Sequence, residues 1–282
     1  MEKIIIISLV SLLLTLSVSL VMASVNPEDF WTDGYCVQKT ALTPTPGAKS
    51  IRAEIDGEWK ELPLVSFPAA FWDWNRNRRI EYLEIFREML ELGAEKARRP
   101  QLSGPHNGMV ATYGAQRKDS AFKLNNAVKG MGFCPREDKI EELIERLKKT
   151  KDAPLAEKLD VLESLYKDAE NIFAHDRLLS LELYSEPGFS TQTFINQMVN
   201  PACVTVFLDI PTYKIKQVVR LLHPMNPNLS KQERLMTEYV NLIHSYFHGE
   251  FPRDYIAAIY YSTEVYDSSP GRKDARGTKM SP

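Results

Sequence analysis

The sequence lacks the features that identify several common classes of protein. Lys and Arg number 35 against 37 for Asp and Glu, so no excess of positive charge indicates a nucleic-acid partner. The three cysteines have no C-x-x-C spacing, which excludes a zinc knuckle and a thioredoxin-like pair. The composition, 44% hydrophobic over 282 residues, is nevertheless that of a globular protein with a substantial core.

Charge is also absent from residues 4–26, an apolar run that follows Lys3. Val21 and Ala23 occupy the −3 and −1 positions of a small-residue cleavage site, which predicts that residues 1–23 are a signal peptide. The protein is then exported, and is periplasmic or secreted. The alternative is an uncleaved anchor, with membrane association through residues 4–23, because about 20 apolar residues can span a bilayer.

Export would allow a disulfide, since an oxidising compartment preserves the bond. Cys36 and Cys134 are the predicted pair, because Cys203 lies in the apolar run "ACVTVFLDI". Cys203 is therefore expected to be a buried and inert thiol.

The first part of the mature chain, residues 24–71, is rich in Pro, Thr and Gly and reads as an extended region. Within it, "SIRAEIDGEWKELPLV" alternates apolar and polar residues on both sides of Asp56-Gly57. Asp-Gly between alternating runs predicts a β-hairpin, and we expect this hairpin to pack on the main domain.

Residues 72–267 are predicted to form one mainly helical domain. Apolar residues at steps of three and four, together with capping signals, indicate helices at about 77–97, 120–130, 136–150, 154–183, 211–222 and 230–249. Residues 202–209 are expected to form one buried strand, whereas 254–267 fit either a helix or a strand. The predicted fold class is mainly α with a minor β component, and residues 268–282 are predicted to be a disordered basic tail.

Two of the five histidines, His244 and His248, are four residues apart on the predicted helix 230–249. At about 100° per residue, both lie outside the apolar stripe and on the same face as one another. Two imidazoles supply half of a tetrahedral zinc shell, so the pair is a candidate site for a divalent metal such as zinc. Ser245 stands where the zincin pattern H-E-x-x-H has its glutamate, which argues against zincin catalysis.

Any further metal ligand must come from another segment. His175 and Asp176 are candidates for that role, and the loop that contains His106 could cover the same face. His106 is also a candidate ligand-binding residue, because a loop of about 20 residues without structure of its own is often functional.

The segment "FWDWNRNRR" at 71–79 places Trp72 and Trp74 among basic and amide residues. Exposed tryptophans would form a ligand- or partner-binding patch. Alternatively, the aromatic side chains are core residues that tie the hairpin to the first long helix.

The sequence supports three hypotheses about function. The first and favoured one is a non-catalytic binding or interaction protein with a protein or small-molecule partner, because no catalytic constellation is complete. The second is a metal-dependent enzyme or metal-binding protein that uses His244 and His248. The third is a structural subunit of a membrane-associated complex, held by an uncleaved N-terminal helix.

Overall fold

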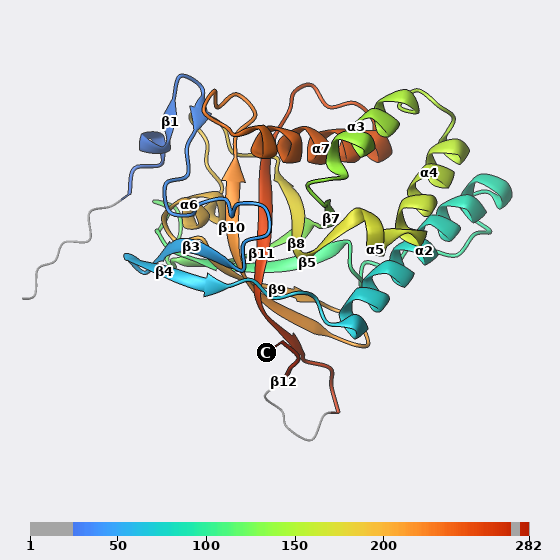
Figure 1. Ribbon diagram of the computed structural model, residues 1–282, viewed down its shortest axis with the longest axis horizontal. Helices are drawn as coiled ribbons and strands as arrows, with labels where there is room; N and C mark the ends of the chain where they lie inside the picture. The colour runs from blue at the N-terminus through green and yellow to red at the C-terminus, as the bar shows by residue number, and fades with distance from the viewer. Residues whose placement is uncertain (1–24, 272–276, 282) are drawn as a thin grey trace, which may run out of the picture.

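The computed structural model describes residues 25–271 and 277–281, and in this part of the chain the fold is mixed (Figure 1). It contains 12 strands and six α-helices, with 32% of the residues helical and 31% in strands. The mainly helical fold class predicted from the sequence is therefore wrong. The predicted signal peptide and anchor, residues 1–23, lie outside the described residues.

The helices and strands alternate along the chain without dividing into separate blocks. The α-helices are α2 (Ala69–Leu92), α3 (Ile140–Lys149), α4 (Leu155–Lys167), α5 (Ala169–Ile172), α6 (Gln192–Val199) and α7 (Lys231–His248), and a short 3-10 helix, η1 (Pro27–Phe30), precedes them. The strands are β1 (Trp31–Thr32), β2 (Tyr35–Cys36), β3 (Ser50–Ile55), β4 (Glu58–Pro63), β5 (Asn107–Tyr113), β6 (Leu124–Gly130), β7 (Gly132–Pro135), β8 (Phe173–Glu182), β9 (Ala202–Phe207), β10 (Tyr213–Leu222), β11 (Ile256–Asp267) and β12 (Thr278–Lys279).

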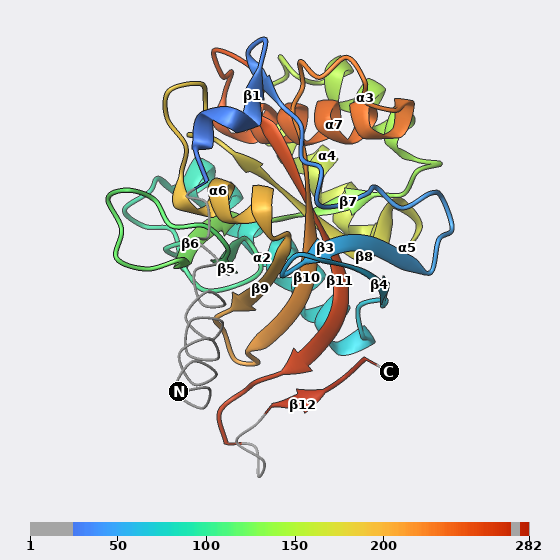
Figure 2. The same cartoon turned by 90° about the vertical axis from the view of Figure 1, so that its left-hand side faces the viewer.

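The central sheet is antiparallel and strongly curled. Its order is β6-β5-β9-β10-β11-β8-β7, with β12 paired to β11. In a flat sheet, six spacings of about 4.8 Å would separate the edge strands β6 and β7 by roughly 29 Å. However, only Met131 connects β6 to β7, and two Cα steps reach about 7.6 Å at most. The sheet must therefore curl until its two edges approach each other. Figure 2 shows the curved strands β9, β10 and β11 that form the middle of this sheet.

A buried ion pair joins the edge strand β6 to β8, the neighbour of the other edge strand. Lys129 on β6 places its Nζ 2.5 Å from Oε2 of Glu182 on β8. The Glu182 side chain is 1% exposed, and its other carboxylate oxygen accepts hydrogen bonds from the hydroxyls of Ser185 and Thr191. We refer to the junction between β6 and β8 as the seam. β6 and β8 are not hydrogen-bonded neighbours in the sheet, so an ion pair and side-chain hydrogen bonds hold the seam in place of a backbone ladder.

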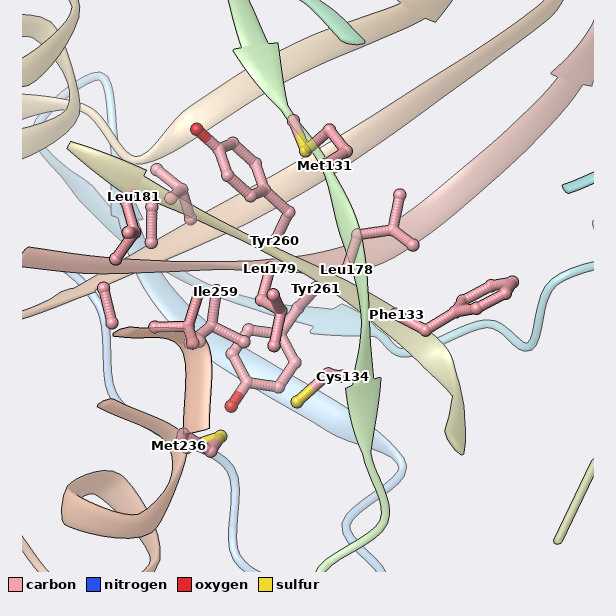
Figure 3. Packing of buried hydrophobic residues seen from close by; sticks show 14 of the residues in the cluster. Met131, Phe133, Cys134, Leu178, Leu179, Leu181, Met236, Ile259, Tyr260 and Tyr261 are labelled. Atoms are coloured by element: carbon pink, nitrogen blue, oxygen red, sulfur yellow. The ribbon is translucent and has the colours of Figure 1, made fainter. Parts of the chain in front are cut away.

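Both faces of the sheet are covered. Consecutive residues Tyr260 and Tyr261 on β11 project to opposite sides, and Figure 3 places Met131 on the side of Tyr260 and Met236 of α7 on the side of Tyr261. Gln197 of α6 donates a hydrogen bond to the Tyr260 hydroxyl, which locates α6 on the first side. The sheet therefore has hydrophobic packing on both faces.

Three segments predicted as helices are strands. Residues 120–130 contain β6, the end of 154–183 is β8, and β10 occupies the segment after Pro211. Six consecutive residues at the end of β8 are buried, so this strand shows no polar alternation. A continuous apolar run does not distinguish a doubly buried strand from a buried helix, which is why periodicity failed there.

Other local predictions are confirmed. The β3–β4 hairpin turns at Asp56 and Gly57, both with positive φ, and residues 202–207 form the strand β9. The capping box at the start of α7 is present, since the Ser230 hydroxyl accepts from the Glu233 amide and the Glu233 carboxylate accepts from the Ser230 amide. The segment 254–267, open between helix and strand, is the strand β11. These elements carry signals that depend on a few neighbouring residues.

Three further expectations can be compared with the structure. All three cysteines are buried and free, so Cys36 and Cys134, the pair favoured for any disulfide, are not joined, while Cys203 is buried as expected. Of the predicted disordered tail, residues 277–281 lie against β11, where the Ser281 hydroxyl accepts a hydrogen bond from the Val265 amide. In residues 25–271 and 277–281, no helix has both the length and the apolar character that crossing a membrane requires.

Candidate functional site

A cavity of about 300 Å³ lies between α2 and α7, beside the bend that joins β6 to β7. One wall is α2, another is the C-terminal half of α7, and Gly130, Met131 and Gly132 of the bend form part of the base. Phe86 of α2 meets Phe247 of α7 edge to face, with 4.8 Å between ring centroids. This aromatic contact connects the two helical walls.

Most of the cavity wall is apolar. Most of the aliphatic and aromatic side chains come from three helices that are far apart in sequence, and they include Leu83 and Phe86 of α2, Leu162 of α4, and Val240, Ile243 and Phe247 of α7. No Asp or Glu contributes to the cavity lining among the described residues. Such a surface suits a largely apolar molecule, and the volume is at the lower end of the range of about 300–1,000 Å³ typical of ligand pockets.

Three imidazoles gather at this cavity. His248 lies 4.8 Å from His244 and 6.4 Å from His106, measured between ring centroids. The helical count therefore placed His244 and His248 on a shared face correctly, and the structure brings His106 to that face. His248 is exposed and the other two are half-buried, so His248 lies nearest to solvent.

The backbone positions His106 directly. Its carbonyl accepts a 2.7 Å hydrogen bond from the Met131 amide, which ties the start of β5 to the β6–β7 bend. A Cβ at Gly130 would lie 3.5 Å from the His106 ring, an ordinary van der Waals separation, so the imidazole lies beside the backbone of the bend. The position of His106 thus depends on the bend as well as on its own loop.

Burial keeps these imidazoles neutral at pH 7. Desolvation is the main cause that lowers the pKa of His106 to about 4, with smaller contributions from the positive charge of Arg79 and from the neighbouring His248 and His244. Desolvation, with a smaller contribution from His248, lowers the pKa of His244 to about 4, and partial desolvation by the residues around it also lowers the pKa of His248, although its side chain is exposed. At neutral pH each ring therefore has one N–H donor and one acceptor nitrogen available to a ligand.

Arg79 brings a positive charge to the cavity. It is 7% exposed, its Nε donates to Asn75 Oδ1 at 2.7 Å, and its Nη2 donates to the carbonyls of Pro105 and Met131 at 3.0 and 2.9 Å. Its guanidinium carbon lies 5.3 Å from the ring centroid of Phe133. Arg79 therefore connects α2 to the loop before β5 and to the β6–β7 bend.

The neighbouring Arg78 is compensated by acidic side chains. Its Nε is 2.9 Å from Oδ2 of Asp209 and its Nη1 is 2.5 Å from Oε2 of Glu81. Gln101 accepts from Arg78 through its side chain and from the Tyr82 hydroxyl through its carbonyl. These bonds hold the segment after α2 along the cavity rim, where Pro100 contributes to the wall.

The other metal candidates, His175 and Asp176, lie elsewhere. Both line a second pocket of about 270 Å³ beside Arg136 and Arg177. Within the part of the chain that the structure describes, no group of three His, Cys, Asp or Glu side chains could hold a metal ion. The predicted metal site is therefore wrong, because the four candidate residues are divided between two separate pockets.

The tryptophan candidates are core residues. Trp72 is 2% exposed and stacks on His175 at 4.1 Å between ring centroids, while Trp74 is 9% exposed and its indole N–H donates to Asp209 at 3.1 Å. Neither lines the cavity. Their burial agrees with the alternative that they are core residues, but their ring contacts among the described residues join α2 to the central sheet and not to the β3–β4 hairpin.

Sequence reasoning missed Arg79, Tyr82 and Phe247 as residues of the site. One signal was available, because Arg79 precedes Leu83 by four residues and Phe86 by seven, and so lies on the apolar stripe of its helix. A charged residue on an apolar stripe is informative, since arginine is rarely buried without a partner. The remaining contacts of the site arise from the tertiary fold.

Comparisons with known proteins do not identify the site. No family model matches the sequence, and no curated protein resembles it significantly.

Proposed function

We propose that the protein is a non-catalytic binding protein for a small, largely apolar molecule, which it holds in the cavity between α2 and α7. The observation that carries this proposal is the apolar wall of a cavity of about 300 Å³, with polar groups limited mainly to the histidines, the two arginines and Tyr82. Ligand pockets of small-molecule binding proteins combine apolar surface with a few polar groups in this way.

The location of the cavity supports the proposal. Its walls come from α2, α4, α7 and the sheet edge, so the folded core positions every wall except the rim segment at Pro100 and Pro105. A binding site on rigid elements loses little conformational entropy when the ligand enters. The uncharged run at residues 4–26 supports an exported protein, and we propose that binding occurs outside the cytoplasm.

Fluorescence of Nile red, an uncharged apolar dye, tests the proposal. We expect the wild-type protein to bind the dye with a saturable increase in emission, and Ile243→Trp to weaken binding at least tenfold because the indole fills the cavity. Leu90→Trp is the matched control, since Leu90 is on α2, is 51% exposed and does not line the cavity. Circular dichroism establishes that both variants are folded.

Two results would contradict the proposed function. One is the absence of saturable dye binding by the folded wild-type protein. The other is equal dye affinity in Ile243→Trp and Leu90→Trp, because a site elsewhere on the surface would then be responsible.

A further inference from the structure

We infer that the ligand of this cavity is an organic carboxylate, whose anionic head is bound by Arg79 and the adjacent imidazoles while its apolar body lies against α4 and α7. This inference rests on the proposed function and specifies the chemical class of its ligand. It starts from the charge balance of the cavity.

Arg79 is a buried cation whose partners are all neutral. Its bonds go to one amide side chain and two backbone carbonyls through Nε and Nη2, and no carboxylate of the described residues lies within ion-pair distance of it. A buried charge is costly unless it is paired, and removing a guanidinium from water requires compensation. The fold leaves that compensation incomplete at the cavity.

The contrast with Arg78 strengthens this point. Arg78, one residue earlier, is half-buried and pairs with both Glu81 and Asp209. Arg79 is more deeply buried and has no such pair among the described residues. The acidic groups of this region thus compensate the arginine that needs them less, and the cavity remains electropositive.

A carboxylate is the anion that fits this environment best. A guanidinium binds a planar carboxylate through charge-assisted hydrogen bonds, and the bonds described for Arg79 leave its Nη1 group for such a contact. His106 and His244 can each donate one N–H to the same head group. The apolar walls then require a ligand with one charged end and a hydrocarbon body, because a fully polar anion would leave them unfilled.

The groups around His106 predict that proton uptake accompanies binding. Charged or titratable side chains that line the cavity with it are Arg78, Arg79 and Tyr82 of α2, Tyr166 of α4, and His244 and His248 of α7, and no acidic side chain of the described residues is among them. A bound carboxylate would be the first negative charge there and would raise the pKa of the imidazoles from their lowered values. Affinity for the anion should therefore increase as the pH falls below 7, because protonation of an imidazole becomes favourable only in the complex.

Calorimetric titration of the full-length, delipidated protein with octanoate and with 1-octanol tests the inference. The two ligands share a hydrocarbon chain and differ in charge, so the wild-type protein alone gives the decisive comparison. At pH 6 we expect octanoate to bind about tenfold more tightly than octanol or better, as charge-assisted hydrogen bonds imply. Octanoate affinity should also increase several-fold from pH 8 to pH 6, where the acid is still ionised, while octanol affinity stays constant.

The possible outcomes separate the two proposals. Equal binding of octanoate and octanol overturns the carboxylate inference and leaves the apolar binding function intact. Binding of neither ligand, together with the absence of Nile red binding, overturns both.

An arginine variant adds a second readout. Arg79→Lys keeps a positive charge but loses the planar guanidinium, whose Nε and Nη2 bonds fix the position of the free Nη1 group, so we expect a loss of at least fivefold in octanoate affinity with little change for octanol. If this variant does not fold, His106→Asn replaces it, and the increase in octanoate affinity from pH 8 to pH 6 should then be smaller than in the wild type. An undiminished increase in His106→Asn would overturn the role assigned to that imidazole.

Discussion

At the scale of single residues, the cavity is electropositive at neutral pH because of Arg79, while the adjacent imidazole of His106 is uncharged. Arg79 stays charged because guanidinium is protonated in all ordinary conditions. His106, half-buried beside it, is neutral because burial and the adjacent cation lower its pKa to about 4. The two residues are linked through the bend, since Arg79 donates to the Met131 carbonyl and the Met131 amide donates to the His106 carbonyl.

This lowered pKa predicts how stability depends on pH. An unfolded imidazole binds a proton near pH 6.5, whereas His106 in the folded protein does so near pH 4. Between these values the unfolded chain gains a proton that the folded protein does not, so the free energy of unfolding falls as the pH falls from 7 to 4. His106→Asn should make this loss smaller by roughly 1–2 kcal/mol.

Urea denaturation at pH 7 and pH 4 measures the effect. The quantity compared is the change in the free energy of unfolding between the two pH values, in the wild type and in His106→Asn, so any pH-independent cost of the substitution cancels. Identical changes in the two proteins would contradict a neutral, buried His106.

At the scale of elements, the bend between β6 and β7 determines the shape of the site. Gly130, Met131 and Gly132 turn one edge of the sheet towards the other, and the Met131 side chain packs where a Cβ at Gly108 of β5 would lie, 2.8 Å from its Cγ. A contact below 3 Å requires a shift of the neighbouring atoms, and the same Cβ would lie 2.9 Å from Thr205 Cγ2. The glycine at 108 therefore allows Met131 to fill the interior of the bend.

Gly108→Ala should consequently destabilise the protein by about 1–3 kcal/mol, the usual cost of overpacking. Gly130→Ala is the control, because its Cβ would meet only the His106 ring at 3.5 Å, an ordinary van der Waals separation. Thermal denaturation compares the two, and the expected result is a clearly lower melting temperature for Gly108→Ala alone. Equal melting temperatures would mean that Met131 is not confined at this position.

The same elements show why the fold was only partly predictable from sequence. The β3–β4 hairpin and α7 were identified because an Asp-Gly turn and a capping box are local signals, complete within a few residues. β8 was missed because it is buried on both faces. β10 does alternate over Tyr213–Lys216, but a register shift between Lys216 and Gln217 interrupts the pattern.

The site was predictable to a similar extent. The shared face of His244 and His248 follows from helix geometry. His106 was selected because a long loop was expected around it, and that expectation is wrong, since β5 begins at the next residue, Asn107. Their meeting does not follow from sequence, because His106 and His248 are brought together by the curled sheet and by the packing of α7 over its edge. The role of Arg79 could not be predicted from the sequence, because only the fold shows that its hydrogen-bond partners are neutral.

At the scale of the whole molecule, closure of the curled sheet places the cavity. The β6–β7 bend lies at the base of the cavity, so the position of the seam determines how β6 and β8 present Met131, Leu179 and Ser180 to the ligand. Lys129 and Glu182 form an ion pair across the seam, and Glu182 is almost completely buried. Closure thus depends on a charge pair in a region of low dielectric, where an unpaired carboxylate is costly.

Removing one partner of this pair should therefore be much worse than removing both. Lys129→Met leaves the Glu182 carboxylate with only the hydroxyls of Ser185 and Thr191, and we expect a loss of about 3 kcal/mol in the free energy of unfolding. The double variant Lys129→Met/Glu182→Gln removes the charge, keeps an acceptor for the two hydroxyls, and should recover at least half of that loss. Urea denaturation measures both values. If the double variant were less stable than Lys129→Met, the buried charge would not be the source of the cost, and the seam would be held by packing alone.

If the pair does hold the seam, Lys129→Met should also weaken Nile red binding more than the double variant does, because the base of the cavity would open with the sheet.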